Sequence, residues 1–319
     1  MTACARPRSA AEANGRARLA TSTSGGETPK PLTRKASLHY ELGGRPFPLP
    51  LVSGTIAGQP VRMLVDTGAN SHFIAGWLAR KLSLPMKKLG DIGTDHVGTA
   101  ISTYRIDGIE MAIDDWGTLG ATTVLATEVS ALYERLGIGA FISPQRLDEE
   151  GDAVLLDLAK GEIRSAWWDD ARRELSAKGT PLVRPEHGRI CEEGDGPVKG
   201  LAFVIPATID AQRVELLLDT GAQHSDVFTT SAAGSELVRG SAASREVMYT
   251  ASGELTARRR AGARIVTGSF EVTADVDLIT GAADGSCPRD GVLAMDVLRS
   301  CALLLGRSQM LGRCQRRSR

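Results

Sequence analysis

The sequence MLVDTGAN at residues 63–70 recurs as LLLDTGAQ at residues 216–223. In both copies three apolar residues lead directly into Asp-Thr-Gly-Ala, with the acid at Asp66 in the first copy and at Asp219 in the second. A given Asp-Thr-Gly triplet arises by accident in a chain of this length in roughly one protein in ten to twenty. One copy would therefore be weak evidence, whereas two copies in the same apolar context indicate a duplicated site.

The duplication extends beyond the motif. Moving the chain by 153 residues, the separation of Asp66 and Asp219, superposes neighbouring apolar residues without a gap. The superposed pairs are Thr55-Ile56 with Thr208-Ile209, Val61 with Val214, and Leu64 with Leu217. Gly139 follows the first acid by 73 residues and Gly291 follows the second by 72. We interpret the chain as a tandem duplication of a unit of roughly 120 to 130 residues.

Each unit has the sequence pattern of β structure. Val52–Ile56 and Val61–Val65 are short aliphatic and β-branched runs around a turn that contains Gly and Pro, which predicts a hairpin. The same pattern recurs at Phe203–Ile209 and Val214–Leu218. The other expected elements are a hairpin at Asp157–Ile163 and short helices at Ala75–Leu82 and Met295–Arg299. These elements predict an all-β fold.

Composition predicts the domain boundaries. Residues 1–36 are rich in Ala, Arg, Ser, Thr, Gly and Pro without an apolar period, which is typical of a flexible leader. Residues 169–200 are charged and also lack a period, which indicates a linker. We expect an N-terminal lobe at 37–168 with Asp66, a C-terminal lobe at 201–312 with Asp219, and a basic tail at 313–319.

The motif suits one kind of chemistry. A carboxylate at the end of a buried strand is held in place by the sheet, and the Gly two residues later lets another chain approach closely because it has no Cβ. Two such turns facing each other would bring two carboxylates together, where like charges cannot both ionise and one proton is shared. Such a pair can activate a water molecule and polarise a carbonyl group without a metal.

At these residues the chain resembles the pepsin and retropepsin superfamily of aspartic peptidases. The resemblance covers about residues 45–165 and 200–312, and the DTGA form is similar to that of retroviral-type and bacterial retropepsin-like enzymes. It implies two β-barrel lobes related by a pseudo-twofold axis, with a central cleft and with Asp66 and Asp219 as the catalytic acids at its floor. The supporting loop residues it implies are Thr67, Gly68, Ala69, Thr220, Gly221 and Ala222, with the two threonines hydrogen-bonding across the axis.

The family also carries an apolar-apolar-Gly sequence late in each lobe, which passes behind the catalytic loop and braces it. Here the second lobe offers Val292-Leu293-Ala294, with Ala in place of Gly, and the first offers Ala140-Phe141-Ile142-Ser143. A mobile flap hairpin is expected roughly 30 residues after each acid, at His96–Ala100 and Tyr249–Gly253, although an ordinary surface turn has the same composition. The candidate flap residues are Val97, Gly98, Thr99, Tyr249, Thr250, Ser252 and Gly253.

Charge and cysteine content exclude little. Net charge is zero, with basic residues concentrated in 1–35 and 307–319, and we assign these ends no nucleic-acid partner. The cysteines are Cys4, Cys191, Cys287, Cys301 and Cys314. Their odd number and spacing predict neither a disulfide framework nor a metal site, and we expect no cofactor. Met1–Cys4 looks like the end of a bacterial lipoprotein signal without its apolar stretch, so the cell envelope and the cytoplasm both stay open.

Three other features favour ordinary structural roles. His72 and His224 lie six and five residues after the acids, so they are not a symmetric pair, and no HExxH or GxSxG string supports zinc or α/β-hydrolase chemistry. Trp167-Trp168 is expected to pack the lobe boundary, and Arg258–Arg260 is expected to be a solvated strand or turn.

The sequence thus predicts an aspartic endopeptidase that acts on peptides or proteins. Because one chain carries both acids, we expect a monomer, and no apolar stretch is long enough to predict a transmembrane segment. The alternative is a non-catalytic peptide- or protein-binding module on the same fold. A third interpretation, in which DTGA is only a tight turn, does not explain why both copies keep an acid that is costly to bury.

Overall fold

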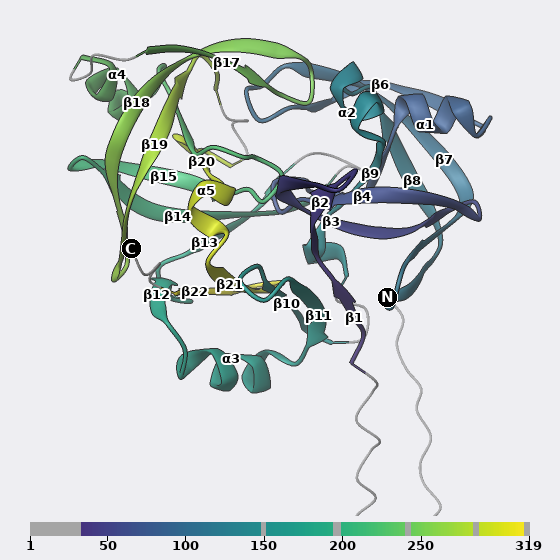
Figure 1. The fold of residues 1–319 in the computed structure, drawn as a ribbon, viewed down its shortest axis with the longest axis horizontal. Coiled ribbons are helices and arrows are strands. Elements are labelled where there is room, and N and C mark those ends of the chain that lie inside the picture. Colours follow the sequence, from purple (N-terminus) through teal and green to yellow (C-terminus); the bar gives the residue numbers. More distant parts are fainter. Residues whose placement is uncertain (1–32, 148–150, 194–198, 240–243, 283–286, 316–319) are drawn as a thin grey trace, which may run out of the picture. The chain divides into compact units, whose positions relative to one another are not determined.

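The computed structural model describes residues 33–147, 151–193, 199–239, 244–282 and 287–315 (Figure 1). Most of the predicted leader, including Cys4, and the last four residues of the predicted basic tail lie outside these ranges. No helix in the described ranges is long and apolar enough to cross a membrane.

The first lobe is built on an eight-stranded sheet. Its strands are β2 His39–Leu42, β3 Arg45–Ile56, β4 Gln59–Val65, β5 Phe73–Ala75, β6 Lys87–Thr94, β7 Ala100–Ile113, β8 Gly117–Thr127 and β9 Ile138–Ile142. They are ordered β2-β3-β4-β9-β5-β8-β7-β6, and an additional pairing of β3 with β7 folds the sheet back on itself. Strand β9 runs parallel to β4, so it lies directly behind the strand that leads into Asp66.

The second lobe repeats this sheet strand for strand. Its strands are β13 Arg189–Glu193, β14 Gly200–Ile209, β15 Gln212–Leu218, β16 Asp226–Phe228, β17 Ser244–Tyr249, β18 Glu254–Thr267, β19 Phe270–Ile279 and β20 Gly291–Leu293. The order is β13-β14-β15-β20-β16-β19-β18-β17, with β14 also paired to β18. The predicted all-β, two-lobed fold is therefore confirmed (Figure 1).

The hairpin turns have the backbone that their loop length requires. Between β3 and β4, Ala57 and Gly58 have φ of 49° and 73°, and between β14 and β15, Asp210 and Ala211 have φ of 47° and 73°. Two consecutive residues with positive φ form the tight turn whose twist matches that of antiparallel strands. Each hairpin therefore leads its second strand straight toward an Asp-Thr-Gly loop.

A third sheet joins the two lobes. Its six strands are β1 Lys35–Ser37, β10 Ala153–Asp157, β11 Glu162–Ala166, β12 Thr180–Val183, β21 Cys301–Gly306 and β22 Met310–Cys314. They are ordered β1-β11-β10-β21-β22-β12, so β10 from the first half of the chain pairs with β21 from the second. The hairpin expected at Asp157–Ile163 is formed by β10 and β11. Two residues of the predicted tail, Arg313 and Cys314, belong to β22.

The predicted linker contains regular structure. The helix α3 Trp168–Ser176 and the strand β12 occupy its first part, and β13 joins the second lobe's sheet. Trp168, Ala171 and Leu175 form the apolar face of α3 and pack against residues of β10 and β21. The two neighbouring tryptophans differ in exposure at the start of this amphipathic helix. Trp168 is buried, whereas Trp167 is exposed.

The remaining helices are α1 Gly76–Lys81, α2 Ala131–Leu136, α4 Ala232–Arg239 and α5 Met295–Leu298, with a 3₁₀ turn at Pro144–Arg146. Helices α1 and α5 lie where the sequence predicted them. The largest buried apolar cluster includes Met63 of the first lobe, Leu216 of the second and Leu303 of the third sheet. The two lobes therefore share one core.

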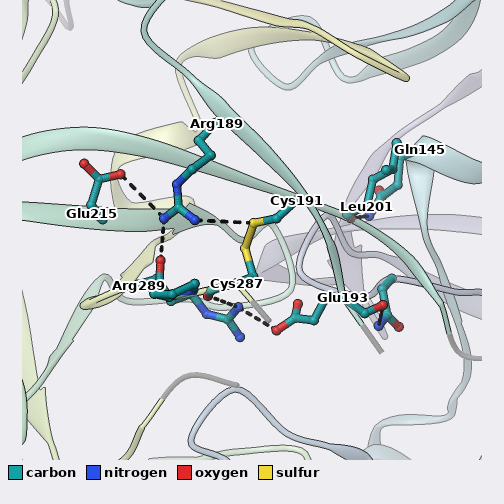
Figure 2. The surroundings of a disulfide bond; sticks show 10 residues. Gln145, Arg189, Cys191, Glu193, Leu201, Glu215, Cys287 and Arg289 are labelled. Carbon is teal, nitrogen blue, oxygen red and sulfur yellow. Dashed lines mark hydrogen bonds and ion pairs between the residues drawn. A yellow bond between two sulfur atoms is a disulfide. The ribbon is translucent and has the colours of Figure 1, made fainter. Parts of the chain in front are cut away.

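The expectation of no disulfide framework is wrong. Cys191 on β13 is bonded to Cys287 (Figure 2). Cys301 is bonded to Cys314 directly across the β21–β22 pair. Disulfide pairing depends on the distance between cysteines in the fold. The first pair is 96 residues apart in sequence, so spacing alone does not reveal it. Cys4 makes the total odd and lies outside the described residues.

Candidate active site

The two acids occupy equivalent positions at the ends of equivalent strands. The backbone N–H of Asp66 donates to Ile142 O at 2.8 Å, and that of Asp219 donates to Leu293 O at 3.0 Å. Both acceptors lie on the strand that runs parallel behind the loop, β9 in one lobe and β20 in the other. The predicted brace is therefore present in both lobes, although Ser143 and Ala294 stand where the family pattern has Gly.

The two loops are joined by their threonines. The Thr67 hydroxyl donates to Leu218 O at 2.7 Å and accepts from the backbone N–H of Thr220 at 3.0 Å. The Thr220 hydroxyl donates to Val65 O at 2.7 Å and accepts from the N–H of Thr67 at 3.1 Å. Both threonines are fully buried. Each threonine hydroxyl thus makes two hydrogen bonds to the other loop. Because both threonines are buried, water cannot take the place of these bonds.

Each carboxylate is fixed within its own loop. Asp66 Oδ1 accepts from the backbone N–H groups of Gly68 and Ala69 at 2.8 and 3.1 Å. Asp219 Oδ1 accepts from Gly221 and Ala222 at the same two distances. One oxygen of each acid is therefore occupied by its own loop.

The glycines of the motif are required by close packing. A Cβ placed on Gly68 would lie 2.7 Å from Cγ of Asp219, and one on Gly221 would lie 2.5 Å from Cγ of Asp66. Each carboxylate thus rests against the other loop's glycine, where only a residue without a side chain fits.

The charge of one acid affects the pKa of the other. Burial raises the pKa of the Asp66 carboxyl well above its usual range, and the charge of Asp219 raises it further. Each carboxyl also lies against the glycine of the other loop, so the two acids are close neighbours. Such a pair can take a proton from water with one member while the other donates a hydrogen bond.

His72 and Ser225 have the same structural task in the two lobes. The Nδ1 atom of His72 accepts from the N–H of Ser143 at 3.1 Å, whereas Ser225 Oγ accepts from the N–H of Ala294 at 3.0 Å. Burial lowers the pKa of His72 to about 4, with Arg146 adding to the shift, so the ring is neutral at neutral pH and able to accept. His72 therefore caps the brace, which agrees with the structural role predicted for it.

Gln145 is a site residue that the sequence did not reveal. Its Nε2 atom donates to Thr67 O at 3.3 Å, to Ala69 O at 2.8 Å and to Leu201 O at 3.0 Å (Figure 2). One amide thus connects the first Asp-Thr-Gly loop to the second lobe. No motif marks it, because a buried glutamine has no sequence signature.

The candidate flap segments form the tips of two hairpins, which we call the first tip (residues 95–99, between β6 and β7) and the second tip (residues 250–253, between β17 and β18). Asp95 Oδ1 accepts from the N–H groups of Val97 and Thr99 at 3.2 and 2.8 Å, and Thr250 N–H donates to Gly253 O at 2.7 Å. Of the other candidates, Gly98 lies in the first tip, Ser252 lies in the second, and the exposed Tyr249 ends β17.

The two tips meet each other and the opposite lobes. Ser252 Oγ donates to the Asp95 carboxylate. Ala282 N–H of the second lobe donates to Val97 O at 3.4 Å, and Ser130 N–H of the first lobe donates to Ala251 O at 2.7 Å. Each hairpin therefore crosses from its own lobe to the other, and the two are arranged alike.

No group of three or more His, Cys, Asp or Glu side chains in the described ranges is placed to hold a metal ion. A family model described as aspartyl protease matches the chain twice, at residues 52–148 and 205–297, and together these segments cover more than half of it. No curated protein shows a significant match. Each matched segment contains one Asp-Thr-Gly loop, the strand that leads into it and the strand that braces it. The sequence resemblance is thus confirmed, and the chain belongs to the aspartyl protease family.

Proposed function

We propose that the chain is an aspartic endopeptidase in which Asp66 and Asp219 activate one water molecule. The observation that carries this proposal is the pair of crossed threonine bonds, because they hold the two equivalent loops together and so keep the carboxyls of Asp66 and Asp219 close to each other. The raised pKa of Asp66 keeps one proton on the pair where an isolated carboxyl would have lost it.

The reaction follows from that single shared proton. The ionised carboxylate takes a proton from water as the water oxygen attacks the carbonyl carbon of the scissile bond, while the protonated carboxyl donates a hydrogen bond to the carbonyl oxygen. The tetrahedral adduct then collapses, the C–N bond breaks, and the leaving nitrogen receives a proton from the pair. The acids return to their starting state with one proton between them.

Endopeptidase action is supported by the symmetry of the site. The strands β5, β8 and β9 flank one acid as β16, β19 and β20 flank the other, so the backbone framework is the same on both sides of the scissile bond. The two hairpin tips are suited to act as paired flaps that part for the substrate and exclude water when closed. Because one chain supplies both halves, we propose a monomeric enzyme.

A peptide library tests the proposal. We expect new termini by mass spectrometry after incubation between about pH 3 and 7, unaffected by EDTA and suppressed by a statine-containing peptide, whose hydroxyl imitates the attacked carbon. Cleavage that EDTA abolishes and statine peptides leave unchanged would overturn the proposal. Binding of statine peptides without cleavage of any library member would favour the non-catalytic binding module instead.

A further inference from the structure

A buried carboxylate lies on the wall of the second lobe beside the acid pair. Asp226 begins β16, seven residues after Asp219, and its side chain is completely buried. Neither of its oxygens accepts a well-formed hydrogen bond from any described residue. Strand β16 pairs with β20, which lies beside β15, the strand that leads into Asp219, so Asp226 lies near Asp219 in the same sheet. Burial raises the pKa of Asp226, and the charge of Asp219 adds to that rise.

The second lobe supplies no cation to Asp226 among the described residues. Asp277 lies directly beside it on β19 and is also buried. Arg259 gives both arms of its guanidinium to Asp277, at 2.8 and 2.9 Å. The arginine on this wall is therefore already committed to the neighbouring acid.

The partner of Asp226 comes from the opposite lobe. His96, at the base of the first tip, places Nε2 at 3.3 Å from Asp226 Oδ2. The ion pair with Asp226 raises the pKa of His96 to about 9 against the opposing effect of burial, and Asp219 and Asp95 add to the rise. Beside it, Val97 packs against Phe228 and Ile279 of the second lobe. The only cation on Asp226 in the described ranges is thus carried by a segment that has to move when a peptide enters.

The first lobe has an aromatic wall at the same place. Register pairs Asp226 with Val292 in the second lobe and Phe73 with Phe141 in the first. The Phe73 and Phe141 rings stack with centroids 4.3 Å apart, and Tyr133 meets Phe141 edge-on at 5.0 Å. The strand positions beside the acid pair therefore carry aromatic rings in the first lobe and a carboxylate in the second.

Lifting the first tip would take away the cation that Asp226 has in the closed chain, and a carboxyl in this position would favour another cation in its place. We propose that Asp226 selects a Lys or Arg side chain of the substrate on one side of the scissile bond, and that Phe73 and Phe141 select an apolar or aromatic side chain on the other. In the closed, unliganded chain His96 occupies the position of that substrate cation. This inference rests on the proposed peptidase function.

The first experiment compares peptides that carry either Lys or norleucine at each position flanking the scissile bond and are otherwise identical. We expect one position at which Lys raises kcat/KM by about 10-fold or more. Asp226→Asn should abolish that preference while changing turnover of the norleucine peptide little. Asp226→Phe, which copies the first lobe, should reverse it. Equal cleavage of both peptides by the natural chain, or a preference that survives Asp226→Asn, would overturn the inference.

The second experiment separates this inference from the proposed function. Non-cleavable statine peptides carrying Lys or norleucine at the same positions are titrated against the natural chain and against Asp226→Asn. A Lys preference in binding that disappears in the variant supports the subsite even when no peptide is cut, and in that case only the proposed function fails. Equal affinities for the two statine peptides would contradict the subsite whether or not cleavage occurs.

Discussion

The two lobes are alike where they hold the acids and different where they would face a substrate. The hydrogen bonds that the brace, the threonines and the loop amides make have nearly the same lengths in the two lobes. Equivalent bonds around Asp66 and Asp219 differ in length by no more than 0.2 Å. A few residues after its acid, each lobe has a different residue at the equivalent strand position. This residue is Phe73 in the first lobe and Asp226 in the second. The two lobes therefore share the geometry that holds the acids and differ at the strand positions beside it.

The largest effect on activity is expected when one of the two equivalent acids is replaced. Asp66→Asn or Asp219→Asn should each lower turnover by several orders of magnitude, because either change removes the state with one charged and one protonated carboxyl. The double variant should be little worse than either single one, as expected for groups that act as a unit. Initial rates on a library-derived peptide measure this.

Dilution provides the control for that comparison. Specific activity of the natural chain should stay constant as concentration falls, because each chain carries both acids. Full activity of Asp66→Asn beside an inactive Asp219→Asn, together with activity that falls on dilution, would instead indicate a dimer built from second lobes.

The next effect compares two ion pairs whose arginines occupy equivalent positions in the two lobes. The acid of the pair is buried in the second lobe and exposed in the first. Arg259→Leu should lower the free energy of unfolding by about 3 to 5 kcal/mol, because it leaves the buried Asp277 without its partner. Arg105 lies at the equivalent register position in the first lobe, where it pairs with the exposed Asp107. Arg105→Leu is the matched control and should change the urea midpoint little. Equal losses for the two variants would contradict this account.

The disulfide between Cys191 and Cys287 lies in the second lobe. Replacing both cysteines by Ser should lower the free energy of unfolding by about 2 to 4 kcal/mol, since the unfolded chain gains freedom when the cross-link is removed. Urea denaturation without reductant measures the loss with Cys301–Cys314 intact. Coincident unfolding curves for the variant and the natural chain would show that the bond adds no stability.

The smallest effect depends on pH and on His72. Its pKa falls from 6.5 in the unfolded chain to about 4 in the folded one, so the unfolded chain binds the extra proton first as pH decreases. The folded state therefore loses up to about 2 kcal/mol between pH 7 and pH 5 through this residue. His72→Ser, which copies Ser225, should remove that contribution. Parallel stability curves for the two proteins over this range would contradict the assignment.

The repeat predicted much of this from sequence. An offset of 153 residues located both loops and both hairpins, because each is specified by local patterns of apolar residues and turns. The two tips were expected from the family resemblance. The same offset would also have paired His72 with Ser225 and Phe73 with Asp226. The repeat is recognised by the residues that the two copies share, and these two pairs of positions carry different residues in the two copies.

Other features have no local signal. The β10–β21 pairing, the bond between Cys191 and Cys287 and the contacts of Gln145 all join segments that the chain brings together only on folding. Arg258–Arg260 was expected to be solvated, yet Arg259 pairs with a buried acid. Which member of an arginine run faces inward depends on sheet register, which a charge pattern does not contain.

The sheet that joins the lobes has a consequence for synthesis of the chain. Strand β10, Ala-Val-Leu-Leu-Asp, pairs with β11 a few residues later, but its other edge pairs with β21, which ends at Gly306. Ribosomes add about 5 to 20 residues per second, so this apolar edge waits on the order of 10 seconds for its partner. Over that interval the nascent chain presents an open strand edge, the form of backbone most prone to pair with other chains. Strand β10 therefore gains its second neighbour only after most of the second lobe has been made.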